Sequence, residues 1–89
     1  MRKQELFHKN LELSTEFNKY VEDHPEILDR IPDQAHLVFL TDGDIELTKT
    51  NRRIAEEIKR RGEKVIFVQF TKLKPVLHTR LVNLKLKAA

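Results

Sequence analysis

Residues 37–47, LVFLTDGDIEL, decide the fold of this chain because they pass from an apolar run through an acidic turn into an amphipathic helix. The helical pattern continues to about residue 61, and Gly62 can end it in a left-handed conformation. A second apolar run, VIFV at residues 65–68, follows closely. Near-continuous apolar runs joined by one helix are typical of buried parallel strands. The stretch therefore predicts a βαβ unit with a right-handed crossover.

The residues before this unit predict two more helices. Apolar side chains recur at three- and four-residue spacing from about residue 3 to residue 22, which favours one long amphipathic helix. Pro25 suits the first turn of a short second helix, and Ile31 ends it because a residue before proline avoids the helical region. The first helix would be roughly 30 Å long at 1.5 Å per residue. We expect it to pack opposite the crossover helix or across a dimer, with its N-terminal end projecting or contacting a second copy.

The end of the chain has a different pattern from the rest. Leucines at residues 84 and 86 alternate with Lys85 and Lys87, as in a strand, and Pro75 marks a break before them. We predict an extended tail with a strand near residues 81–86. The expected architecture is a small single α/β domain of order α-α-β-α-β, with a compact part at residues 1–71 and a basic tail at residues 72–89 that is extended or forms an edge strand.

Length and composition limit the class of protein. Eighty-nine residues make one small domain with a modest core. The absence of cysteine excludes disulfides and thiolate metal sites. The sequence has no apolar run of transmembrane length, and residues 1–20 lack the apolar segment of a signal peptide. We therefore expect a cytoplasmic protein without a membrane-bound segment.

Charge is unevenly distributed along the chain. Residues 1–70 hold 12 Lys and Arg against 14 Asp and Glu, a net charge of −2, whereas residues 71–89 hold five basic residues and no acid. A basic tail is one feature of nucleic-acid-binding proteins. Lysines on an edge strand also prevent edge-to-edge pairing, so a purely structural role is the favoured interpretation. The candidate nucleic-acid contacts are Lys72, Lys74, Arg80, Lys85 and Lys87.

The acidic turn is the sharpest candidate for chemistry. Asp42 and Asp44 follow a strand end, where open α/β sheets bind ligands, and two carboxylates at this spacing can hold Mg²⁺. Lys72 follows the second strand and would lie nearby to contact a phosphate. The favoured alternative is structural, with an Asx turn at Asp42, positive φ at Gly43 and a helix cap at Asp44. No other cofactor is expected.

Other catalytic patterns are missing from the sequence. The four histidines show no metal-ligand spacing, and Ser14, the only serine, lies within a predicted helix. Two glycines are too few for a Walker loop or a dinucleotide-binding turn. We therefore expect a non-enzymatic protein, with a metal-dependent phosphate-handling enzyme at Asp42 and Asp44 as the alternative.

The crossover helix has two notable polar features. Asn51 lies among its apolar residues, and it either hydrogen-bonds a neighbouring backbone or helix or lies wet at the edge of the stripe. The opposite face carries four Arg–Glu pairs at four-residue spacing, which are expected to neutralise the arginines. These pairs are Arg52–Glu56, Arg53–Glu57, Glu56–Arg60 and Glu57–Arg61.

Several short motifs follow one another along the chain: FNKYV at 17–21, HPE at 24–26, IPDQA at 31–35 and VFL at 38–40. DIEL at 44–47, Asn51 and the second apolar run continue the series, and TRLVN at 79–83 is a weaker match. Over roughly residues 7–70 this order resembles a family of small uncharacterised bacterial and archaeal proteins, a domain of unknown function. The resemblance implies a compact α/β fold and a cytoplasmic location, and no activity. Short prokaryotic proteins of this kind often belong to two-gene modules, which suggests a protein partner encoded nearby.

The leading hypothesis is a self-associating interaction or regulatory module, most simply a homodimer. Two strands are too few for an independent sheet, so the missing strand comes from the tail or from another protomer. The long first helix offers a second reason to expect association. Its candidate contact residues are Leu13, Phe17 and Tyr20.

Overall fold

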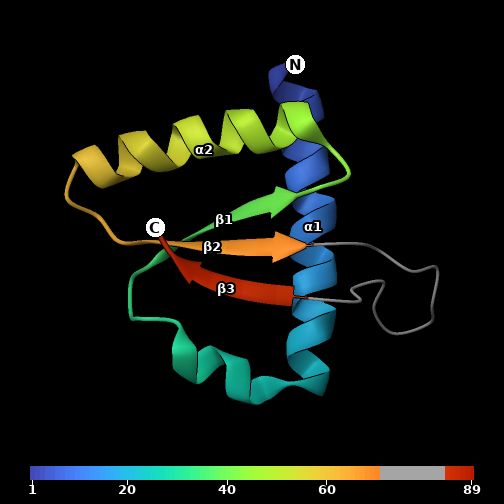
Figure 1. Cartoon of the computed structure of the whole chain (residues 1–89). Helices are drawn as coiled ribbons and strands as arrows, with labels where there is room; N and C mark the ends of the chain where they lie inside the picture. Colours follow the sequence, from blue (N-terminus) through green and yellow to red (C-terminus); the bar gives the residue numbers. More distant parts are fainter. Residues whose placement is uncertain (71–83) are drawn as a thin grey trace.

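The structure is a computed structural model that describes residues 1–70 and 84–89. Within these ranges the chain forms a small α/β domain with helices on both sides of a three-stranded sheet (Figure 1). The predicted fold class and element order are confirmed. The elements are α1 (Lys3–Asp23), the 3-10 helix η1 (Pro25–Arg30), β1 (His36–Thr41), α2 (Ile45–Arg60), β2 (Val65–Phe70) and β3 (Leu84–Ala88).

The sheet has the strand order β1-β2-β3, so β2 is central. β1 and β2 are parallel, with His36 opposite Val65 and Thr41 opposite Phe70, which confirms the predicted βαβ unit. β3 is antiparallel to β2, with Leu86 opposite Val68. The missing third strand therefore comes from the end of the same chain, and the sheet needs no second copy to reach three strands. The predicted strand positions 81–83 lie outside the described residues.

The two long helices cover opposite faces of the sheet, because side chains of β1 and β2 point alternately to either side. Leu13 and Phe17 of α1 are buried with Val68 and Phe70 on one face, and Leu84 and Leu86 of β3 pack against the same cluster. On the other face, Ala55 and Ile58 of α2 are buried with Val38, Leu40 and Val65. The expected placement of the first helix opposite the crossover helix is therefore correct.

The turn between β1 and α2 is held by side chains. Asp44 caps α2, because its Oδ1 accepts a hydrogen bond of 3.0 Å from the backbone N–H of Leu47. The Gly43 N–H donates to Thr41 Oγ1 at 3.2 Å, so a threonine hydroxyl makes the local bond that was expected from an Asx turn at Asp42. The expected positive φ at Gly43 is wrong. In the described part of the chain, positive φ occurs at Gln34 (63°) and at Gly62 (81°), where the predicted left-handed helix end is confirmed.

The N-terminal half of α1 reaches the beginning of α2. Lys9 Nζ lies 2.7 Å from Asp44 Oδ2, and this ion pair joins positions 35 residues apart in the sequence. The N-terminal end of α1 is thus attached to its own domain, although Phe7 stays exposed on it. Among residues 1–70 and 84–89, no helix combines the length and the apolar composition needed to cross a bilayer.

Candidate functional site

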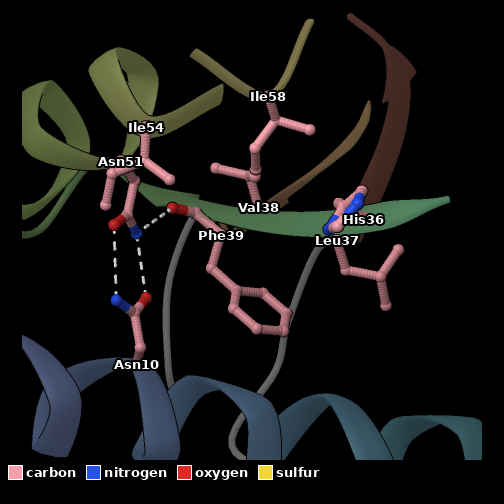
Figure 2. A pocket seen from close by; sticks show the side chains of 8 residues that line it. All are labelled: Asn10, His36, Leu37, Val38, Phe39, Asn51, Ile54 and Ile58. Atoms are coloured by element: carbon pink, nitrogen blue, oxygen red, sulfur yellow. Dashed lines mark hydrogen bonds between the residues drawn. The ribbon is translucent and has the colours of Figure 1, made fainter. Parts of the chain in front are cut away.

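A pair of asparagines joins the two helices beside the outer edge of β1. Asn51 Nδ2 donates to Asn10 Oδ1 at 2.9 Å, and Asn10 Nδ2 donates to Asn51 Oδ1 at 3.3 Å. Figure 2 shows the two amides facing each other from α1 and α2, with β1 between the helices. Asn51 Nδ2 also donates to the Phe39 carbonyl at 2.8 Å. Asn51 is only 3% exposed, so the prediction that it bonds a neighbouring backbone or helix is confirmed and the wet alternative is wrong.

The backbone of β1 alternates between its partner strand and the open edge. The His36 N–H bonds the Lys64 carbonyl and the Asp42 N–H bonds the Phe70 carbonyl, so even-numbered residues face β2. The backbone N–H and C=O groups of residues 37, 39 and 41 therefore point away from β2. β1 is thus an outer strand whose free side lies in the gap between α1 and α2.

Side chains of α2 satisfy part of this free side. Thr48 Oγ1 accepts from the Thr41 N–H at 3.0 Å and donates to the Thr41 carbonyl at 2.8 Å. Asn51 satisfies the Phe39 carbonyl in the same way. Three groups remain without a partner in the described part of the chain: the N–H and C=O of Leu37 and the N–H of Phe39. Unpaired strand groups of this kind are a template for pairing with another strand.

A cavity of about 230 Å³ lies at this open segment. Most of its lining is apolar, and the asparagine pair is its principal polar feature (Figure 2). The lining residues are Asn10, His36, Leu37, Val38, Phe39, Asn51, Ile54 and Ile58. A few polar groups within an apolar cavity are typical of binding sites. The cavity and the open segment of β1 form one site, which we call the β1 edge site.

Exposed apolar side chains occur on both helices that contribute to the β1 edge site. Phe7 is 63% exposed on α1, three residues before Asn10. Leu11, one turn after Phe7, is 51% exposed. Ile54, at 38% exposure, lines the cavity from α2. Ile54 is therefore the partly exposed apolar side chain at the open strand edge, and Phe7 and Leu11 are exposed on α1.

The residues proposed for self-association from the sequence lie mostly inside the domain. Leu13 and Phe17 are 6% and 4% exposed and belong to the core on the α1 face of the sheet. Tyr20 is half-buried and stacks on His24, with ring centroids 4.4 Å apart. Phe7 and Leu11 are the large apolar residues that α1 leaves exposed.

The acidic turn is occupied by structural contacts. Asp44 caps α2 and pairs with Lys9, and the hydrogen bond from Lys9, followed by that from the Leu47 N–H, lowers the pKa of Asp44 below its ordinary value. Asp42 is exposed, and Gln69 Nε2 donates to its Oδ1 at 3.4 Å. Lys72 lies outside the described residues. Among the described residues, no group of three His, Cys, Asp or Glu side chains is arranged to hold a metal ion.

Basic side chains from two elements lie on the α2 side of the sheet. Lys85 and Lys87 are exposed and stand opposite Gln69 and Phe67 of β2, on the face of β3 away from α1. The Arg52 guanidinium lies 5.5 Å from the centre of the Phe67 ring. The expected Arg–Glu pairs along α2 are not formed. Arg61 bonds Glu63, and among these described residues no ion pair joins Arg52, Arg53 or Arg60 to Glu56 or Glu57. Lys72, Lys74 and Arg80 lie outside the described residues.

Sequence reasoning missed Asn10 and Thr48. Both look like ordinary polar positions of amphipathic helices. Their roles follow from β1 being an outer strand, which depends on where β3 pairs. Of these residues, only Asn51 could be recognised from the sequence, because a polar residue within an apolar stripe indicates a buried hydrogen bond.

The sequence matches a described family of unknown function, DUF5647, over residues 5–84. The chain belongs to this family. The match covers nearly all of α1 and continues to the first residue of β3, so the whole βαβ unit and the β1 edge site fall within the DUF5647 domain. Comparison with curated proteins and with solved structures gives no match.

Proposed function

We propose that this DUF5647 protein is a non-enzymatic interaction module that associates with a second copy of itself. The observations that carry the proposal are the open edge of β1, with Ile54 partly exposed in the cavity beside it, and the exposed apolar side chains Phe7 and Leu11 of α1. Burying a side chain of this size stabilises an interface by about 1.5–3 kcal/mol, whereas leaving it in water contributes nothing. The acidic turn supports a non-catalytic role, because Asp44 already caps a helix and pairs with Lys9.

Self-association is not required to supply a missing strand. β3 completes a three-stranded sheet within one chain, so a monomer is a folded unit. Self-association is supported instead by the exposed surface of that unit. This surface is contributed by α1, β1 and α2.

Sedimentation velocity across a concentration series tests the proposal. We expect a dimer at micromolar concentration that weakens at least tenfold in a Phe7→Ser variant. Leu28→Ser is the matched control, because Leu28 is 51% exposed on η1, outside the β1 edge site, and its loss should leave the dimer unchanged. A parent protein that stays monomeric at high micromolar concentration would contradict the proposal, as would equal effects of the two substitutions.

A second candidate function, nucleic-acid binding, is favoured by one observation. Lys85, Lys87 and Arg52 share the α2 side of the sheet, where Arg52 lies over an aromatic ring instead of pairing with a glutamate. Residues of one β-strand face are spaced by about 6.6 Å, so Lys85 and Lys87 place two positive charges close together on one face of β3. Lysine and arginine contacts to phosphates supply most non-specific affinity for nucleic acids.

Fluorescence anisotropy with a labelled DNA duplex tests this second candidate. Five phosphate contacts would give a slope of log affinity against log salt of about −4 to −5. The five candidates are the basic residues of the tail: Lys72, Lys74, Arg80, Lys85 and Lys87. A Lys85→Glu/Lys87→Glu variant should bind at least tenfold more weakly. Lys3→Glu/Arg30→Glu changes the net charge equally at other exposed positions and should have a smaller effect. Equal effects of the two double substitutions, or no binding at low salt, would exclude this function for the basic face.

A further inference from the structure

We infer that the β1 edge of one copy pairs antiparallel with the β1 edge of a second copy, with Leu37 opposite the partner's Leu37, to make one continuous six-stranded sheet. This inference rests on the proposed self-association and names its geometry. It is carried by the backbone groups of β1, by the position of the asparagine pair and by the cavity.

The unpaired backbone groups of β1 are self-complementary. Leu37 offers both an N–H and a C=O at the open edge, and neither has a partner in the described part of the chain. In an antiparallel ladder, two opposite residues whose backbone groups point toward each other form two hydrogen bonds, because each N–H donates to the other residue's C=O. A two-fold axis between the two Leu37 residues therefore satisfies the donor and the acceptor together. The same register brings the Phe39 N–H to the partner's Ala35 carbonyl.

The asparagine pair limits the register. Asn10 and Asn51 meet beside Phe39, and Asn51 already bonds the Phe39 carbonyl (Figure 2). A strand that slid further along β1 would have to displace these bonds. When the two Leu37 residues face each other, Phe39 faces the partner's residue 35, and the partner strand begins there. Gln34, with φ of 63°, turns the chain there, so the partner leaves the edge where the asparagines begin.

The side chains around the edge suit the same arrangement. A two-fold axis at Leu37 places α2 next to the partner's α2 and α1 next to the partner's α1, because each helix covers one face of the combined sheet. Ile54, which lines the cavity and is 38% exposed, would meet its own counterpart across the axis. β1 carries no Lys, Arg, Glu or Asp within its bounds, so it lacks the lysines that discourage pairing along an edge strand.

Amide hydrogen exchange measured by NMR tests the geometry directly. In the dimer, the Leu37 and Phe39 N–H groups should exchange at least tenfold more slowly than in an Ile54→Glu variant or after dilution to the monomer. The Val38 and Leu40 N–H groups bond β2 and should stay protected in both states, which makes them internal controls. Leu28→Glu is the matched control, because Leu28 is exposed on η1. The Leu37 amide of this variant should exchange as slowly as in the parent protein.

The possible results separate this inference from the proposed function. A dimer whose Leu37 and Phe39 amides exchange as fast as in the monomer would overturn edge pairing and leave self-association in place. A protein that is monomeric by sedimentation at every concentration would overturn both. Protection of Leu37 that is lost on dilution, together with steady protection of Val38, supports the pairing.

Discussion

The two outer strands of the sheet, β1 and β3, differ in the features that limit pairing with further strands. β3 carries its own charges, because Lys85 and Lys87 alternate with the leucines that pack on α1. β1 has no lysine, and its outer backbone groups are met by Thr48 and Asn51 of α2. A charged edge strand repels any neighbouring strand along its length, whereas side-chain caps protect only the groups that they bond. The capped strand therefore keeps an open segment at Leu37, and the charged strand needs no cap.

The two edges therefore differ in what they leave open. The β1 edge is apolar, partly capped and lined by helices that expose Phe7, Leu11 and Ile54. The β3 edge carries the exposed Lys85 and Lys87. The following predictions change residues near the β1 edge or on β3, in order of decreasing effect on the free energy of unfolding.

Removing core side chains beneath α1 should have the largest effect. Leu13→Ala should lower the free energy of unfolding by about 2–5 kcal/mol, because Leu13 is 6% exposed in the core on the α1 face of the sheet. Phe7→Ala, on the same helix, should change it by less than about 0.5 kcal/mol at concentrations where the protein is monomeric. Urea unfolding followed by circular dichroism measures both. Similar losses for the two variants would mean that Phe7 is buried within the monomer.

Removing the asparagine bridge should have the next largest effect. Asn51→Ala leaves the Phe39 carbonyl and the Asn10 amide without their partner, which should cost about 1–3 kcal/mol in urea unfolding. Asn18→Ala is the control, because Asn18 is exposed on α1. If both substitutions cost the same, the bridge between the helices contributes nothing to stability.

Removing the cap of α2 should have a smaller, pH-dependent effect. Asp44→Ala should cost about 1 kcal/mol at neutral pH, because the cap of α2 and the pair with Lys9 are lost. The pKa of Asp44 is lowered in the folded state, so its contribution is complete above the ordinary Asp value of 3.8 and is lost as pH falls through the lower folded value. The difference between parent and variant should therefore shrink in acid. Asp42→Ala removes an exposed carboxylate of the same turn that caps no helix, and it should not show this cost at neutral pH.

Removing the charges of β3 should barely change stability. Lys85→Thr/Lys87→Thr should alter the free energy of unfolding by less than about 0.5 kcal/mol, because both side chains are exposed. Light scattering at high concentration should instead show more association than in the parent, since the strand has lost its repulsive charges. Unchanged scattering would show that β3 does not need its lysines for protection.

Much of the fold could be predicted because it depends on local pattern. The apolar runs, the helix between them, the Asp44 cap and the Gly62 end all follow from neighbouring residues, and each is observed. Gly43 was predicted wrongly because the Thr41 hydroxyl satisfies its N–H without a left-handed backbone. The Arg–Glu pairs were expected from spacing alone, but spacing does not require exposed side chains to meet.

Local pattern is enough to predict the βαβ unit, the burial of its strands on both faces and the unusual position of Asn51 in an apolar stripe, because periodicity and capping act over a few residues. The central place of β2, the contact between Asn51 and Asn10 across 41 positions and the open edge at Leu37 follow from the folded arrangement alone. These features depend on which strand the end of the chain joins. Strand pairing is a long-range choice between similar backbones, and no local pattern records it.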